Sequence, residues 1–130
     1  MENLSCVTGL QHLGLPTADL ENTIQFYRKL GFTVINRETI PSDGQPVAFL
    51  KLQGLILEIY QQREIPAQTG AWNHVALEVT DIERTWEEVQ NCGMKPLEVK
   101  IQFLPFWENG VSYFNVKGPN QEIIEFIQKR

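Results

Sequence analysis

The chain has few cysteines, no long apolar run and no cluster of basic residues. Its two cysteines, Cys6 and Cys92, show no metal-binding or redox spacing. Lys and Arg number 11 against 16 Asp and Glu, for a net charge of −5, which argues against nucleic acid as a partner. No segment has the roughly 20 apolar residues of a membrane helix, and no signal peptide is evident. We therefore expect a soluble, cytoplasmic protein with reduced thiols and no membrane partner. Cys92 lies at the end of a predicted helix, where we expect a buried thiol.

Histidine is equally scarce, and the two histidines occupy equivalent places in an internal repeat. Residues 12–31 align without a gap on residues 74–93. The matched pairs include His12 with His74, Asp19 with Asp81, and Gly31 with Gly93. Each copy then ends in an apolar segment that contains one carboxylate, Glu58 in the first and Glu125 in the second. A carboxylate in such a strand is costly unless it is paired, exposed or bound to a metal.

A metal site is therefore the leading hypothesis. A single histidine on a strand is usually a packing residue, and a single glutamate on a strand usually faces water. The hypothesis depends on the matched placement of all four residues, His12, Glu58, His74 and Glu125.

Each copy is predicted to fold as a βαβββ module of an α+β protein. Asp19 and Asp81 are the expected helix N-caps, because their carboxylates can accept hydrogen bonds from the free N–H groups of the first turn. Gly31 and Gly93 suit the left-handed position after a helix. The expected strands are residues 7–15, 32–39, 46–52 and 55–61 in the first module, and residues 72–79, 95–103, 111–117 and 122–128 in the second. The modules cover about 7–61 and 72–128, joined by a linker at 62–71 within one domain of residues 1–130.

With these residues in place, the sequence resembles the vicinal oxygen chelate superfamily. This group includes glyoxalase I, methylmalonyl-CoA epimerase, extradiol dioxygenases, and fosfomycin- and bleomycin-resistance proteins. The resemblance runs from about Val7 to Gln128 and is carried by the helix segment 19–32 and the terminal hairpin 113–125. It implies two tandem modules that form a half-open, glyoxalase-like barrel around a divalent metal ion. The implied ligands are His12, Glu58, His74 and Glu125.

Two histidines and two glutamates are the ligand pattern of bacterial-type glyoxalase I. The expected ion is Ni, Co, Mn, Fe or Zn. The first four fit a six-coordinate site with two open positions better than does zinc, whose structural sites are closed and tetrahedral. The resemblance implies a lactoylglutathione lyase-like lyase or isomerase whose small chelating carbonyl or hemithioacetal substrate reacts through an enediolate. Glu58 or Glu125 would be the catalytic group that moves the proton.

Departures from the family pattern leave alternatives open. Pro16 stands where glyoxalase I has an arginine for the glutathione carboxylate, and Gln62 replaces an asparagine, which argues against glutathione. An epimerase is disfavoured by Glu58 and by Ala48 at the position of its base. A dioxygenase is disfavoured by the short chain. A metal-free or metal-assisted binding protein of the drug-resistance type remains the main alternative.

The resemblance also implies a homodimer with its sites at the interface. In that arrangement His12 and Glu58 of one chain meet the partner's His74 and the partner's Glu125, although pairing within one chain stays open. The loop at 104–110 contains two aromatic residues, Phe106 and Trp107. They are expected either to form a wall of the metal pocket or to cover the end of the barrel.

Overall fold

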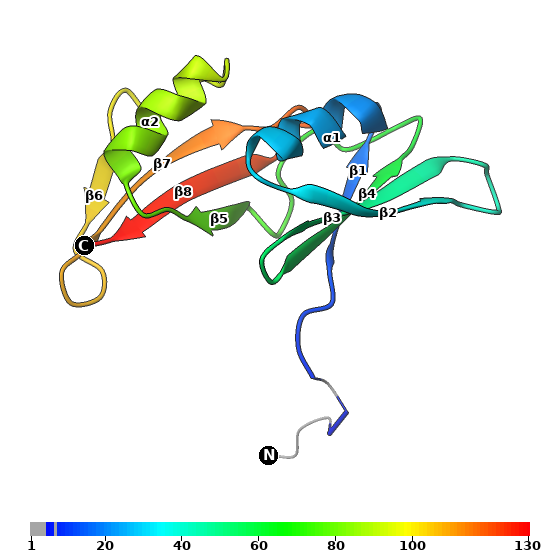
Figure 1. The fold of residues 1–130 in the computed structure, drawn as a ribbon, viewed down its shortest axis with the longest axis horizontal. Coiled ribbons are helices and arrows are strands. Elements are labelled where there is room, and N and C mark those ends of the chain that lie inside the picture. Colours follow the sequence, from blue (N-terminus) through cyan, green and yellow to red (C-terminus); the bar gives the residue numbers. More distant parts are fainter. Residues whose placement is uncertain (1–4, 7) are drawn as a thin grey trace. The chain divides into compact units, whose positions relative to one another are not determined.

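The computed structural model describes residues 5, 6 and 8–130, so Val7 at the start of the first expected strand lies outside the described residues. The chain divides into two compact units, the first ending at Arg63 and the second beginning at Glu64. Each unit has one helix and a four-stranded mixed sheet in the order βαβββ (Figure 1). The α+β class and the two-module architecture are therefore confirmed. Each sheet is open, because its outer strands do not pair with each other among the described residues.

The first unit has strand order β1-β4-β3-β2, with β1 parallel to β4 and the other neighbours antiparallel. Its elements are β1 (Leu13–Thr17), α1 (Leu20–Lys29), β2 (Thr33–Thr39), β3 (Pro46–Leu52) and β4 (Leu55–Gln61). Helix α1 packs on β3 and β4. The buried core of this unit includes Leu20, Ile24, Tyr27, Leu50 and Ile59.

The second unit repeats this arrangement, with strand order β5-β8-β7-β6 and β5 parallel to β8. Its elements are β5 (His74–Glu78), α2 (Ile82–Asn91), β6 (Gln102–Leu104), β7 (Val111–Lys117) and β8 (Ile123–Lys129). Helix α2 packs on β7 and β8, where the Trp86 ring lies edge-on to Phe114 with centroids 5.0 Å apart.

The helix boundaries agree with the sequence prediction. Asp19 accepts a hydrogen bond from the backbone N–H of Asn22 at 3.1 Å, and Asp81 accepts one from Arg84 at 3.0 Å. Both aspartates are therefore N-caps. The glycines that follow the helices have positive φ angles of 104° and 83°, which suits glycine because it has no Cβ to clash there.

A glutamine from the last strand of each unit anchors the start of its helix. Gln61 accepts a hydrogen bond from the Leu20 N–H at 3.0 Å, and Gln128 accepts one from the Ile82 N–H at 2.8 Å. Side chains alternate between the two faces of a strand, so a residue three positions earlier lies on the opposite face. The helix therefore covers one face of each sheet, and the glutamate of β4 or β8 lies on the other.

Several sequence expectations are wrong in detail. The first strand of each module is short, and β1 begins only after His12, because its partner β4 begins at Leu55 and leaves little backbone to pair with earlier residues. The strand expected at 95–103 is reduced to Gln102–Leu104 and an isolated bridge from Pro96. Cys92 is exposed rather than buried, because it follows the last turn of α2.

Over the part of the chain that the structure describes, no helix is both long enough and apolar enough to cross a lipid bilayer.

Candidate functional site

The first unit brings His12 and Glu58 together on the face of the sheet that α1 does not cover. His12 directly precedes β1, and Gly14 two residues later lies opposite Glu58 on β4. The distance between His12 Nε2 and Glu58 Oε1 is 3.6 Å. A Cβ at Gly14 would come within 3.4 Å of the Tyr60 ring and 3.9 Å of Glu58 Oε1. Glycine therefore leaves the space beside the glutamate open.

The other ring nitrogen of His12 is already engaged. Its Nδ1 is hydrogen-bonded to Oε1 of the preceding residue, Gln11. The amide oxygen can only accept, so this contact favours the tautomer of the neutral ring in which Nδ1 carries the proton and Nε2 the lone pair. The Phe49 ring lies edge-on to the imidazole with centroids 5.8 Å apart. These contacts orient Nε2 towards Glu58.

The second unit repeats this pair. His74 opens β5, and its Nε2 lies 3.8 Å from Glu125 Oε2. Its Nδ1 is hydrogen-bonded to Oδ1 of the preceding residue, Asn73, at 2.9 Å. The Glu125 side chain is 15% exposed and that of Glu58 is 31% exposed, so the second carboxylate is the more desolvated of the two.

The amides that hold the histidines were missed by the sequence analysis, although a signal was present. Gln11 and Asn73 occupy equivalent places, each directly before its histidine. Histidines that bind metals commonly donate their second N–H to an oxygen, which fixes the ring and its tautomer. A carboxamide repeated beside each histidine therefore fits the ligand hypothesis.

Each pair has suitable chemistry for sharing a divalent ion. The distances of 3.6 and 3.8 Å between the imidazole nitrogen and the carboxylate oxygen are too long for hydrogen bonds. They are shorter than the sum of two metal–ligand bonds of about 2.0–2.2 Å each, so one ion can contact both atoms. Within residues 5, 6 and 8–130, however, no group of three or more His, Cys, Asp or Glu side chains is placed to hold a metal ion. Each unit thus supplies two donors, and the joint site of four ligands stays a prediction.

The two carboxylates differ in electrostatic environment. Burial raises the pKa of Glu125 above its ordinary value, the nearby His74 lowers it, and the negative charge of Glu98 raises it again, with an upward net effect. A raised pKa is typical of carboxyl groups that exchange protons in active sites.

Glu98 and Asn115 also belong to the surroundings of Glu125, and the sequence analysis missed both. Asn115 on β7 lies directly opposite Glu125 on β8. Its backbone N–H and its side-chain Nδ2 both donate to the Glu98 carboxylate, at 2.8 and 2.7 Å. No motif marks these residues, because Glu98 lies in a segment whose pattern predicts an ordinary strand.

The aromatic loop residues lie at the other end of the second unit's sheet. Lys129, the last residue of β8, places its Nζ 4.7 Å from the centroid of the Trp107 ring. Lys129 is four residues beyond Glu125, which corresponds to about 13 Å along a strand. Phe106 packs edge-on to Trp107, with centroids 6.3 Å apart. The Trp107 ring therefore lies beside the Lys129 side chain, and Phe106 packs against that ring.

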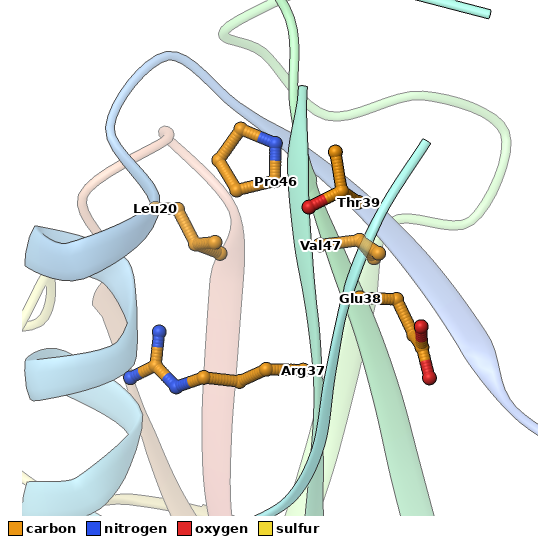
Figure 2. A pocket seen from close by; sticks show the side chains of 6 residues that line it. All are labelled: Leu20, Arg37, Glu38, Thr39, Pro46 and Val47. Carbon is orange, nitrogen blue, oxygen red and sulfur yellow. The ribbon is translucent and has the colours of Figure 1, made fainter. Parts of the chain in front are cut away.

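A cavity of about 490 Å³ lies in the first unit beside the start of α1 (Figure 2). The residues that line it are Leu20, Arg37, Glu38, Thr39, Pro46 and Val47. Arg37 is hydrogen-bonded to Glu21 at 2.7 Å, and this contact raises the pKa of Arg37 and lowers that of Glu21. None of the four candidate ligands lines this cavity, so it is separate from the His12–Glu58 pair.

Comparison with known proteins identifies relatives along nearly the whole chain. The model of the Glyoxalase/Bleomycin resistance protein/Dioxygenase superfamily matches residues 9–126. The uncharacterized protein YwbC of Bacillus subtilis (strain 168) is 31% identical over 126 residues, which are 92% of this chain and 97% of that protein.

Solved structures with the same fold include two bacterial proteins. A glyoxalase family protein from Enterococcus faecalis is 21% identical with a TM-score of 0.77, covering 92% of this chain and 96% of that chain. The fosfomycin resistance protein FosX from Listeria monocytogenes, complexed with Mn(II) and sulfate, is 16% identical with a TM-score of 0.74. That match covers 95% of this chain and 94% of the other.

Proposed function

Because the chain belongs to the glyoxalase/bleomycin resistance protein/dioxygenase superfamily, we propose that it is a metal-dependent lyase or isomerase of the glyoxalase I type. Its substrate would be a small chelating carbonyl compound or hemithioacetal. The observation that carries this proposal is the repeated pair of one imidazole and one carboxylate, at 3.6 Å in the first unit and 3.8 Å in the second. Each module thus places one nitrogen donor and one oxygen donor side by side.

His12, Glu58, His74 and Glu125 would hold the ion, which would be Ni, Co, Mn, Fe or Zn. We propose that two copies of the chain share each site, as a homodimer. When bound, the ion would stabilise negative charge on the vicinal oxygens of the substrate. The hydrogen bonds of Gln11 and Asn73 to the two Nδ1 atoms keep each Nε2 available as a ligand.

Glu125 is the better candidate for moving the substrate proton. Its side chain is half as exposed as that of Glu58, and its pKa is raised by burial and by Glu98 against the opposing effect of His74. A base whose pKa lies closer to neutrality holds the proton better after removing it, and can return it to the neighbouring carbon. Glu58 would then act mainly as a ligand.

A metal-assisted enzyme of another kind, or a binding protein of the drug-resistance type, is the second candidate. The similarity of fold to a fosfomycin resistance protein complexed with Mn(II) supports this second candidate. A binding protein needs a groove for its ligand but no imidazole–carboxylate pair in each module, so the repeated pairs favour the enzyme.

Metal content and turnover, measured on the same samples, test the proposal. The protein is stripped with a chelator, reloaded with each of the five ions, analysed for bound metal, and assayed with hemithioacetals of several thiols. We expect one ion per set of four ligands and conversion of at least one hemithioacetal. Glu87→Gln is a matched control for the ligand variants, because it removes one carboxylate from the exposed surface of α2. Bound metal without turnover of any hemithioacetal would favour the binding protein.

A further inference from the structure

Next to β7, the carboxylate of Glu98 takes the place of a backbone carbonyl of a neighbouring strand. In an antiparallel pair, the N–H of Asn115 would donate to a backbone carbonyl of the neighbouring strand. Here it donates to Oε1 of Glu98 at 2.8 Å, and the side-chain Nδ2 of Asn115 donates to Oε2 at 2.7 Å. Leu97 returns one backbone bond to the Asn115 carbonyl at 2.8 Å. The carboxylate thus fixes both the backbone and the side chain of Asn115.

Asn115 lies on the same face of the sheet as Glu125. The two residues are directly opposite in the antiparallel β7–β8 pair, where facing side chains project to the same side with Cβ atoms about 4.5–5.5 Å apart. Phe114, next to Asn115, contacts Trp86 of α2, so Asn115 projects away from the helix. It is therefore a neighbour of the His74–Glu125 pair.

The contact with Glu98 determines which atom Asn115 presents to this face. An ionised carboxylate can only accept, so the amide must turn its NH₂ group to Glu98 and leave Oδ1 as the remaining acceptor. No hydrogen bond reaches Oδ1 from any residue of the described chain. Every buried side-chain nitrogen or oxygen in that part of the chain has a partner. Oδ1 is consequently not a fully buried atom and retains some accessible surface.

At the strand position opposite its glutamate, the first module has an apolar side chain in place of this acceptor. The residue opposite Glu58 is Phe49, whose ring packs edge-on against His12. The two modules share the imidazole–carboxylate pair but differ at the strand position beside it. A polar group is therefore fixed next to one pair, and an apolar ring next to the other.

We propose that Asn115, oriented by Glu98, is a specificity-determining residue that accepts a hydrogen bond from a substrate hydroxyl. The preferred substrates are then carbonyl compounds with a hydroxyl group on each side of the carbonyl, in place of those with a methyl group on one side. This inference rests on the proposed function, because the carbonyl and one hydroxyl are the groups that chelate the metal ion.

Two ketones that differ by one hydroxyl group test the inference. Dihydroxyacetone and hydroxyacetone both offer a vicinal hydroxyl and carbonyl, and only the first has a second hydroxyl to donate. Their dissociation constants are measured by NMR titration of Zn²⁺-loaded protein. Dihydroxyacetone can chelate through either of two equivalent hydroxyls, so its affinity should exceed that of hydroxyacetone about twofold on statistical grounds alone. A hydrogen bond to a neutral acceptor should raise this ratio in wild type to about four- to twentyfold. The side-chain amide signals of Asn115 should shift with dihydroxyacetone.

Two variants separate a specific role from a structural one. Asn115→Leu should retain only the statistical difference of about twofold between the two ketones. Glu98→Gln keeps the shape but places an NH₂ group against Nδ2, so the amide of Asn115 should rotate and present its NH₂ group to the face. In this variant the preference for dihydroxyacetone should fall to the statistical value of about twofold, and the Asn115 amide signals should be displaced in the ligand-free protein. Gln90→Leu on α2 is the control that removes a carboxamide elsewhere.

The outcomes distinguish this inference from the proposed function. Bound zinc with a preference for dihydroxyacetone of no more than about twofold in wild type overturns the inference alone, and so does a larger preference that survives in both variants. Failure of wild type to bind zinc overturns the proposed function. If Asn115→Leu fails to fold, as judged by circular dichroism, the nearly isosteric Glu98→Gln variant tests the inference by itself.

Discussion

Replacing Glu125 by Gln should slow turnover far more than replacing Glu58 by Gln. Both changes keep the size of the side chain and remove one charge from a candidate ligand, so their effects on metal affinity should be comparable. Only Glu125 combines a side-chain exposure of 15% with a pKa raised by burial. General acid–base catalysis contributes about 10²- to 10⁴-fold to rates. Glu125→Gln should therefore cost about 3–5 kcal/mol in the barrier, whereas Glu58→Gln should cost much less.

The assay separates the proton step from metal binding. Each variant is measured at saturating metal, with metal content determined on the same sample, and kcat is obtained for the best hemithioacetal. The same reaction in D₂O reports exchange of the transferred proton with solvent, which requires a protein base that is accessible to water. Glu87→Gln, on the exposed surface of α2, controls for the loss of one charge. Small and equal losses in the two variants would refute the proton-transfer role, and a larger loss in Glu58→Gln would transfer that role to Glu58.

The remaining predictions concern assembly, the thiol and acid stability. If two chains share each site, a mixture of His12→Ala and His74→Ala chains should regain part of the metal binding that each variant lacks, as measured by calorimetry; sites within one chain would give no rescue. Glutathione hemithioacetal should be a poor substrate, because Pro16 stands where an arginine would hold the glutathione carboxylate, and rapid formation of the lactoyl thioester would contradict this. The hydrogen bond from Arg37 lowers the pKa of Glu21 below the ordinary 4.5. The stability that this pair contributes is therefore present above that value and is lost as the pH falls through the folded pKa. In Arg37→Gln, the free energy of unfolding measured in urea should fall less steeply as the pH is lowered. An unchanged pH profile would count against the contact.

The sequence contains enough local information to predict most of the fold. Each helix start depends on an aspartate that caps its own first turn, and each helix end on a glycine with positive φ. These interactions span three or four residues, so the residue types reveal them directly. Strands β3, β4 and β7 have the predicted bounds, because turn residues flank apolar runs on both sides. The first strands were predicted too long, since their length depends on the partner strand rather than on their own residues.

The candidate site could be predicted only in part. The repeat places one histidine and one glutamate at matching points of each module, and the structure brings each pair to 3.6 or 3.8 Å. Joining both pairs around one ion stays a prediction. The carboxamides at Gln11 and Asn73 could have been found from the same repeat, because they precede the histidines in both copies.

The contact between Glu98 and Asn115 could not have been found in that way. The alternation of apolar and polar residues around Glu98 is the same whether a backbone carbonyl or a carboxylate accepts the Asn115 N–H, so the pattern predicts a strand in either case. The contact becomes visible only when the register places Asn115 opposite Glu125. The repeat gives no help either, because Phe49 occupies the matching place in the first module. A duplicated module can change this position without losing its imidazole or carboxylate. Specificity is therefore expected where the two copies differ, and metal binding where they agree.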